Sequence, residues 1–204
     1  MKIIANYLNQ DEINQFKSWI ESYKPNTKEI QNEHIKSINN EINGFSVLYN
    51  ISNTEVSKVV SGYQGDNTIV ENLPDIFVNL SDKIANDLNI SKDHTFVQVI
   101  RVNAGGKVRT HYDAACPNYI TYKCNINLDG PELDAVHVDK DVLEIKTGDL
   151  YCFEASLYKH WVEKLDKDRV LLSYGFMLPY ADLGWDENSP RVRLSNRIWN
   201  HFQK

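Results

Sequence analysis

Short segments, either alternating or compactly apolar, fill the middle of the chain and constrain its fold more than any other feature. β-Branched and aromatic residues arranged as in strands occur in residues 95–102, 107–111, 142–146, 150–153 and 169–176. Glycine-containing turns at 103–106 and 147–149 separate neighbouring segments. The pattern predicts a mainly β fold, a barrel-like sandwich, with supporting helices.

Two helices are predicted on the N-terminal side of these strands. Asn9 and Glu12 form a capping arrangement, with a side-chain acceptor ahead of an acid. Apolar residues then recur at helical spacing, and the pattern ends at Lys24-Pro25; these residues are Ile13, Phe16, Ile20 and Tyr23. A second helix is predicted over 75–88, with a buried stripe of Ile76, Leu80, Ile84 and Leu88. We expect both helices to brace the outside of the β structure.

The whole chain, 1–204, is predicted to form a single domain, since 204 residues suffice for one well-filled core. Its expected parts are mostly helical support with a lid region (1–95), a β core (96–180) and a C-terminal tail or helix (181–204). Within the first part we expect a further helix over 29–43, a strand over 45–49, and a polar loop over 52–67 that could act as a lid.

A candidate metal site lies among the predicted strands. His111 and Asp113 stand at a strand end and point to the same side, and His160 begins a later strand. Two imidazoles and one carboxylate can occupy one face of an octahedral metal and leave the opposite positions open, as in non-haem Fe(II) oxygenases. A second His-x-Asp pair begins at His137, but it precedes an acidic run, and we interpret His137 as a solvated hairpin residue.

An arginine follows the second histidine of this pattern. Residues 160–165 and 169–176 are predicted to form a hairpin around the turn at 166–168. Arg169, Leu171 and Ser173 then share one strand face, where a guanidinium and a hydroxyl could together bind a carboxylate. The alternative is that Arg169 only closes a surface ion pair with an acid of that turn, Asp166 or Asp168.

Two segments resemble a known family. The segment from Gln98 to Asp113 resembles the approach to the metal in prolyl-hydroxylase-like Fe(II)/2-oxoglutarate dioxygenases, and the segment from Lys146 to His160 resembles the second half of that motif. Its continuation to Leu172 is closer to the aspartyl/asparaginyl hydroxylases and the bacterial free-proline hydroxylases. The resemblance covers residues 96–180.

The resemblance implies a double-stranded β-helix, or jelly roll, that uses O2 and 2-oxoglutarate and yields succinate, CO2 and a hydroxylated product. It implies His111, Asp113 and His160 as ligands of Fe(II), and Arg169 as the anchor of 2-oxoglutarate. Tyr122 and Ser173 are our candidates for further hydrogen bonds to 2-oxoglutarate; ordinary core packing is the alternative for Tyr122.

The substrate is open between different classes. The first hypothesis is an amino acid, either a small molecule or part of a peptide or protein, with Arg109 and Arg101 as candidate contacts for its carboxylate. The second is a nucleic-acid base or methyl group, as in the AlkB-like branch of the same superfamily. The third is no catalysis at all: a jelly roll that keeps its metal for structure or binds a small ligand.

The nucleic-acid hypothesis depends on the C-terminal tail, where Trp185 and Trp199 are accompanied by the basic residues Arg191, Arg193, Arg197 and Lys204. The formal net charge of −6 argues against it, because phosphate-tracking surfaces carry a basic excess. We therefore expect an amphipathic helix from Val192 with solvated arginines.

Composition points to a cytoplasmic protein. No apolar run approaches the length of a membrane span, and the N-terminus lacks a signal-peptide pattern. The three cysteines are odd in number and form no Cys-x-x-Cys pair, which suggests reduced thiols. The oligomeric state is not predicted.

Overall fold

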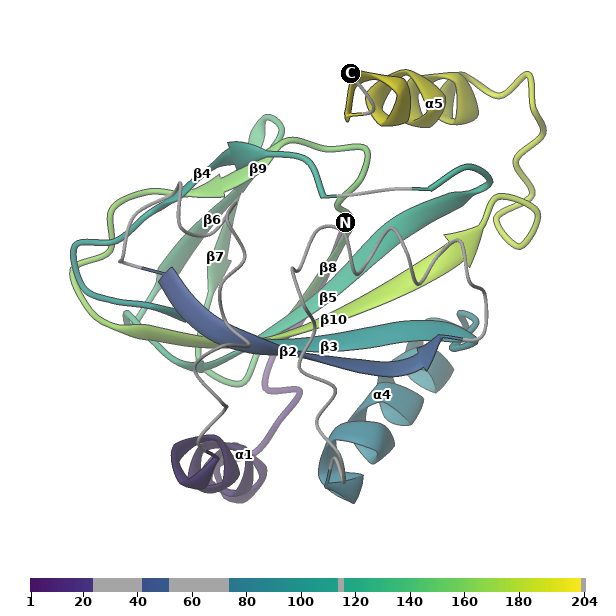
Figure 1. The fold of residues 1–204 in the computed structure, drawn as a ribbon. Helices are drawn as coiled ribbons and strands as arrows, with labels where there is room; N and C mark the ends of the chain where they lie inside the picture. Colours follow the sequence, from purple (N-terminus) through teal and green to yellow (C-terminus); the bar gives the residue numbers. More distant parts are fainter. Residues whose placement is uncertain (24–41, 52–73, 114–115, 203–204) are drawn as a thin grey trace.

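The computed structural model describes residues 1–23, 42–51, 74–113 and 116–202, with the backbone alone for 42–51. This part contains two antiparallel β-sheets that pack face to face, and three helices (Figure 1). The arrangement confirms the predicted jelly roll with supporting helices. None of the helices in these ranges is long and apolar enough to cross a membrane.

The larger sheet has six strands in the order β1-β8-β5-β10-β3-β2. From edge to edge these are β1 (Lys2–Ile4), β8 (Leu150–Glu154), β5 (Tyr119–Asp129), β10 (Arg169–Pro179), β3 (His94–Val102) and β2 (Ile42–Ile51). The central pair, β5 and β10, has the longest pairing, from Val170 opposite Asp129 to Pro179 opposite Tyr119, with a register shift between Val170 and Leu171. β5 has no counterpart among the strands predicted from the sequence.

The smaller sheet has four strands in the order β4-β9-β6-β7. These are β4 (Val108–His111), β9 (His160–Val162), β6 (Asp134–Val138) and β7 (Asp141–Ile145). A buried cluster between the two sheets draws on both, with Val136 and Val162 from the smaller sheet and Phe153 and Leu171 from the larger one. This side of the larger sheet is therefore its inner face.

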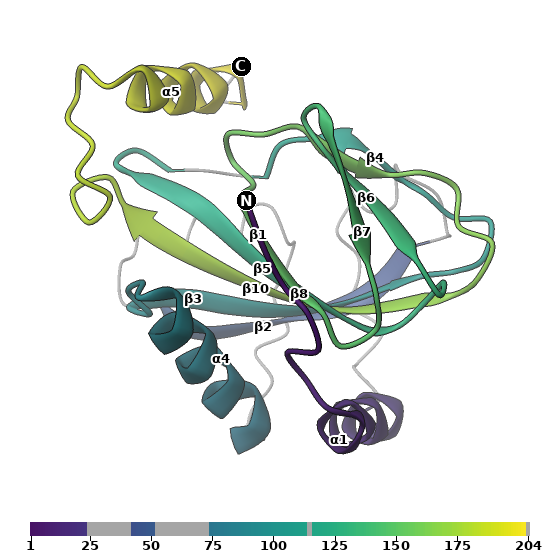
Figure 2. The ribbon, with the colours of Figure 1, turned by 180° about the vertical axis from the view of Figure 1, so that it is seen from behind.

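Two helices, α1 (Gln10–Ser22) and α4 (Asp75–Leu88), cover the outer face of the larger sheet (Figure 2). The capping box of Asn9 and Glu12 begins α1, and the predicted Ile13, Phe16 and Ile20 are buried. In α4 the predicted Leu80 and Ile84 are buried, and so is Phe77, which was not part of the predicted stripe. The ring of Phe77 lies 5.0 Å from that of Phe16, at an angle of 84°. The helices thus brace the sheet as expected.

The predicted hairpin of 160–165 with 169–176 is wrong. β9 pairs with β4 and β6 in the smaller sheet, whereas β10 pairs with β5 and β3 in the larger one. The intervening segment crosses between the sheets beside the 103–106 turn, where Gly105 N–H donates to the Leu165 carbonyl at 2.8 Å. Local alternation marks both strands but does not specify the sheet that each one joins.

The remaining expectations for the N-terminal part fall mostly outside the described residues. The strand expected at 45–49 lies within β2. Of the helix expected over 29–43, Ile42 and Asn43 belong to β2 and the rest is not described; the lid expected at 52–67 is not described either. At the other end of the chain, α5 (Pro190–Phe202) contains the helix expected from Val192.

Candidate metal centre

Strand pairing brings the two imidazoles together. His111 is the last residue of β4, His160 is the first of β9, and the two are direct partners in the antiparallel register. Their ring centroids lie 4.2 Å apart. Two histidines that are distant in sequence are therefore held side by side by the backbone of the smaller sheet.

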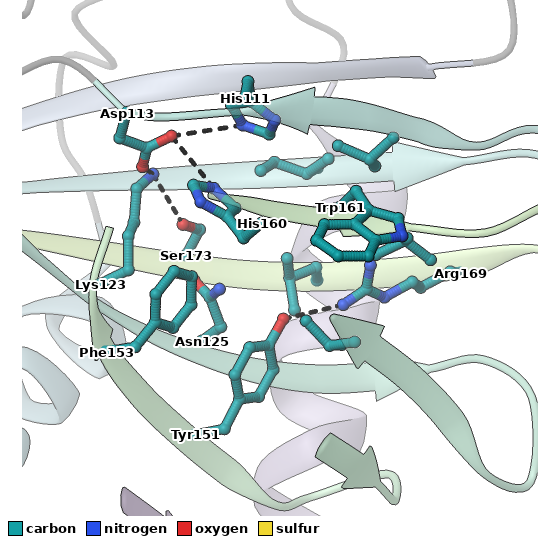
Figure 3. A pocket seen from close by; sticks show the side chains of 15 residues that line it. His111, Asp113, Lys123, Asn125, Tyr151, Phe153, His160, Trp161, Arg169 and Ser173 are labelled. Carbon is teal, nitrogen blue, oxygen red and sulfur yellow. Dashed lines mark hydrogen bonds and ion pairs between the residues drawn. The ribbon is translucent and has the colours of Figure 1, made fainter. Parts of the chain in front are cut away.

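Asp113 completes the group from the segment that follows β4. Its backbone N–H donates to the Ala155 carbonyl at 2.9 Å, which fixes the segment against the end of β8. Its Oδ1 lies 3.4 Å from Nε2 of both His111 and His160. One ligand atom from each of the three residues lies within 4.8 Å of the others, so the predicted triad converges on one point (Figure 3).

Backbone carbonyls orient both imidazoles. Nδ1 of His111 lies 2.7 Å from the Arg109 carbonyl, and Nδ1 of His160 lies 3.1 Å from the Tyr158 carbonyl. Because a carbonyl can only accept, each Nδ1 carries the proton of the neutral ring and each Nε2 keeps its lone pair for a metal. Two nitrogens and one carboxylate oxygen on one side of a metal fit Fe(II).

The electrostatic surroundings of the three residues favour the binding of a metal cation. Burial alone would raise the pKa of Asp113, but the Lys123 ammonium, and then His160 and His111, hold that pKa well below its usual range. Burial alone would lower the pKa of His111, but the hydrogen bond to Asp113 and the charge of that carboxylate outweigh burial and raise the pKa. The carboxylate therefore stays ionised, while protonation of His111 competes with metal binding.

The triad opens into a cavity whose floor is the centre of the larger sheet. Arg169, Leu171 and Ser173 of β10 all line this cavity, as their predicted common face requires. Lys123 and Asn125 line it from the neighbouring strand β5. The candidate metal ligands and the guanidinium of Arg169 thus line one cavity (Figure 3).

Arg169 is held by a buried network rather than by a surface acid. Its Nε lies 2.7 Å from Oδ2 of Asp134, and neither side chain is more than 3% exposed. Its Nη2 donates to the Tyr151 hydroxyl at 2.9 Å, and both nitrogens approach Asn127 Oδ1 at 3.3 Å. The alternative pairing with the 166–168 turn is wrong, since Asp168 instead accepts from the Ala104 N–H.

Two predicted contacts lie on the wrong side of the larger sheet. Tyr122 is on the face of β5 that packs against the helices, because side chains alternate and its neighbour Lys123 points into the cavity. Arg101 reaches the carbonyl of Ile20 at the end of α1, at 3.3 Å. Neither residue lines the cavity.

Arg109 and His137 lie nearer the site. Arg109 is exposed on β4 and does not line the cavity, while its carbonyl orients His111 as described. His137 does lie in a hairpin, as predicted: it belongs to β6, opposite Val142 of β7. It is half-buried rather than solvated, and its ring stacks on that of Trp161 at 4.6 Å and 11°. Trp161 does line the cavity.

Three residues of the site, Lys123, Tyr151 and Asp134, were not predicted from the sequence. A signal existed for the first, because the odd positions of 121–129 are polar (Thr121, Lys123, Asn125, Asn127 and Asp129) and the even ones are mostly apolar. Asp134 follows a Gly-Pro turn and has no local sign of its complete burial.

Two arginines and one tryptophan of the tail are engaged within the molecule. Arg191 pairs with Glu154 at 2.6 Å, and its guanidinium lies 5.1 Å from the Trp185 ring centroid. Arg193 donates to the Asn188 carbonyl at 2.6 Å. These contacts anchor α5, and they account for two of the arginines on which the nucleic-acid hypothesis depended.

We predict that Asp134→Ala destabilises the fold by about 3–5 kcal/mol, because it leaves the Arg169 charge buried without its partner. Asp129→Ala is the matched control: its carboxylate pairs with Lys17 and Lys167 but is 38% exposed, so the expected loss is about 1 kcal/mol or less. Urea unfolding of the two variants measures both values. Equal losses would contradict the structural role of the buried pair.

We also predict that metal binding weakens as the pH falls through the raised pKa of His111. Protonated imidazole cannot bind a metal, whereas the carboxylate of Asp113, with its lowered pKa, stays ionised. Apparent affinity for Co(II) should fall roughly tenfold per pH unit, starting above the ordinary imidazole pKa of about 6.5. Titrations from mildly basic to mildly acidic pH test this, with His201→Ala as a control that should keep the same profile.

The chain is similar to known proteins in its structure rather than in its sequence. No family model matches the chain, and no curated protein matches its sequence. Solved structures do match. HygX from Streptomyces hygroscopicus, with nickel and 2-oxoglutarate bound, has a TM-score of 0.56 at 10% identity and covers 87% of this chain and 82% of its own.

Two further structures agree. A prolyl-4-hydroxylase from Pseudomonas putida has a TM-score of 0.54 at 12% identity, over 87% of this chain and 91% of its own. An oxidoreductase of the 2OG-Fe(II) oxygenase family from Burkholderia pseudomallei has a TM-score of 0.55 at 15% identity, over 85% of this chain and 82% of its own. The chain therefore has the jelly-roll fold of the 2-oxoglutarate/Fe(II) oxygenases.

Proposed function

We propose that the protein is an Fe(II)- and 2-oxoglutarate-dependent dioxygenase that hydroxylates an unactivated C–H bond, with succinate and CO2 as co-products. The observation that carries the proposal is one cavity that contains the converging donor atoms of His111, Asp113 and His160 together with the guanidinium of Arg169. The likeness of fold to 2-oxoglutarate/Fe(II) oxygenases supports it.

In this proposal Nε2 of His111, Nε2 of His160 and Oδ1 of Asp113 hold the iron. A bound Fe(II) would supply the activation of O2 for oxidative decarboxylation of the 2-oxo acid and for C–H hydroxylation. The carbonyls of Arg109 and Tyr158 keep the imidazoles oriented, and a wall that includes Phe153 and Leu171 limits the access of water.

Arg169 is the proposed anchor of the distal carboxylate of 2-oxoglutarate. Its Nε and Nη2 are engaged by Asp134, Asn127 and Tyr151, while no side chain or carbonyl of the described ranges hydrogen-bonds Nη1. Burial raises the pKa of Tyr151, against the opposing charge of Arg169, so its phenol keeps a proton. Nη1 and this phenol would offer a carboxylate two donors.

Ser173 is the proposed further contact of 2-oxoglutarate. It lines the cavity on the same face of β10 as Arg169, and its hydroxyl accepts a hydrogen bond from Lys123 at 3.1 Å. The hydroxyl proton is therefore available to a ligand oxygen.

For the substrate we propose an amino acid, either free or within a peptide, in a cytoplasmic setting. The matched structures include a prolyl-4-hydroxylase, a viral collagen prolyl hydroxylase, and HygX with hygromycin B bound. Arg109 is the proposed contact for a substrate carboxylate, because it is exposed on the strand that carries His111.

We predict that 2-oxoglutarate added anaerobically to the Fe(II)-loaded protein produces a visible charge-transfer band. His160→Ala should abolish the band, since it removes one of three metal ligands. Arg169→Ala should raise the 2-oxoglutarate concentration needed for the band by roughly 10- to 100-fold, the usual loss for a charged hydrogen bond.

The control for this titration is Arg197→Ala, which removes an exposed guanidinium of α5 and should behave as the unmodified protein. No band in the unmodified protein would contradict the proposal and leave a metal-stabilised or ligand-binding jelly roll.

We predict that a panel of amino acids and short peptides contains compounds that accelerate the conversion of 2-oxoglutarate to succinate and gain one oxygen atom by mass. For such a compound, Arg109→Ala should raise the substrate KM by about tenfold, the weight of one charged contact, without changing the requirement for 2-oxoglutarate. An unchanged substrate KM would remove Arg109 from the site. Stimulation by a methylated single-stranded oligonucleotide instead would favour the nucleic-acid hypothesis.

A further inference from the structure

Lys123 is a second buried cation in the cavity, and the proposed anchoring of 2-oxoglutarate leaves it without a role. Its side chain is 9% exposed, in the middle of β5. Its ammonium donates to Gln98 Oε1 at 2.9 Å and to Ser173 Oγ at 3.1 Å, and lies 3.2 Å from Oδ2 of Asp113. A buried ammonium is costly unless it is paired, so these contacts define its position closely.

Lys123 and Arg169 serve different ends of the cavity. Lys123 lies opposite Gly175 on β10, six residues beyond Arg169, which corresponds to roughly 20 Å along the strand. In Figure 3 the two cationic side chains lie on either side of the imidazoles, with Lys123 beside Asp113 and Arg169 beside Tyr151. Lys123 therefore acts on the metal end of the site.

The two oxygens of Asp113 have different surroundings. Oδ1 lies 3.4 Å from Nε2 of each histidine. Oδ2 is buried, faces the Lys123 ammonium at 3.2 Å, and has no hydrogen-bond partner of good geometry among the residues that the structure describes. The carboxylate thus directs one oxygen to the metal position and the other to a cation.

The number of carboxylate oxygens that bind the metal determines how many of its coordination positions stay open. Carboxylates bind metals through one oxygen or two. With one oxygen, the triad leaves three positions of an octahedron, enough for a two-oxygen chelate and O2; with two, it leaves only two. A device that keeps Oδ2 away from the metal would therefore preserve the capacity of the site.

We propose that Lys123 is this device: a positioning residue that holds Oδ2 of Asp113 and makes the aspartate a one-oxygen ligand. The inference rests on the proposed function, which it deepens. Lys123 has a second effect through its charge. Its positive charge neutralises the charge of Asp113, as Arg169 neutralises that of Asp134. With a divalent metal bound, the cavity would therefore have a net charge of two positive units, which matches a dianionic 2-oxo acid.

The test is to remove the charge of Lys123 and to follow metal and co-substrate separately. Lys123→Met and Lys123→Gln should bind Co(II) at least as tightly as the unmodified protein, because a cation beside the metal is gone and Oδ2 is free to bind. In the Co(II)-loaded protein without co-substrate, the visible absorption should change as the aspartate adds its second oxygen. The Fe(II)-loaded variants should need about 10- to 100-fold more 2-oxoglutarate to form the charge-transfer band.

Two control variants show whether the effect comes from the charge of Lys123 at this position. Lys123→Arg keeps a cation at this place and should restore most of the 2-oxoglutarate affinity. Lys167→Met removes a lysine that is 60% exposed at the turn before β10 and should change neither ligand. Lys123→Gln keeps hydrogen bonds to Gln98 and Ser173, so it covers the case in which Lys123→Met does not fold.

The results that would overturn the inference can be told apart from those that would overturn the proposed function. Equal losses of Co(II) and 2-oxoglutarate affinity, with a lower melting temperature, would make Lys123 a structural residue and overturn the inference. Unchanged Co(II) spectra and unchanged 2-oxoglutarate affinity would overturn it as well. If the unmodified protein binds Co(II) but no 2-oxoglutarate, the proposed function fails, and the Co(II) spectra of the Lys123 variants still decide how Asp113 binds the metal.

Discussion

Two buried ion pairs join the sheets across the cavity, and the arrangement of the site depends on them. Arg169 of β10 meets Asp134 of β6, and Lys123 of β5 meets Asp113, which follows β4. In each pair the cation comes from the larger sheet and the carboxylate from the smaller sheet or the segment next to it. Because an unpaired charge is very costly in such surroundings, the pairs set the relative position of the two layers as well as the charge of the cavity.

The central strands explain how one sheet serves a core and a site at once. β5 and β10 pair over most of their length, and alternation gives each an outer apolar face toward α1 and α4 and an inner polar face toward the cavity. On the outer face Cys124, Leu172 and Tyr174 are fully buried. The inner face can therefore carry buried polar groups, since the outer face supplies the apolar burial that stabilises the sheet.

Much of this could be predicted from sequence, because much of it is local. Alternation placed Arg169, Leu171 and Ser173 on one face, and helical spacing with a capping box located α1 and α4. The same rule, applied to 119–129, would have revealed β5, put Lys123 in the cavity and removed Tyr122. The pairing of Asp134 with Arg169 and the separate sheets of β9 and β10 were beyond prediction, because they arise from contacts between distant segments that no local pattern encodes.

The division of the site between the two sheets has a consequence for molecular size. The imidazoles belong to the smaller sheet and the guanidinium of Arg169 to the larger one. Hydrogen bonds from Gly105 N–H to the Leu165 carbonyl and from Leu165 N–H to the Gly106 carbonyl tie together the two crossings that connect the layers. A ligand that touches both ends must match this fixed gap. The cavity would then select dicarboxylic acids by chain length. An acid one methylene shorter or longer would reach the metal or the guanidinium but not both.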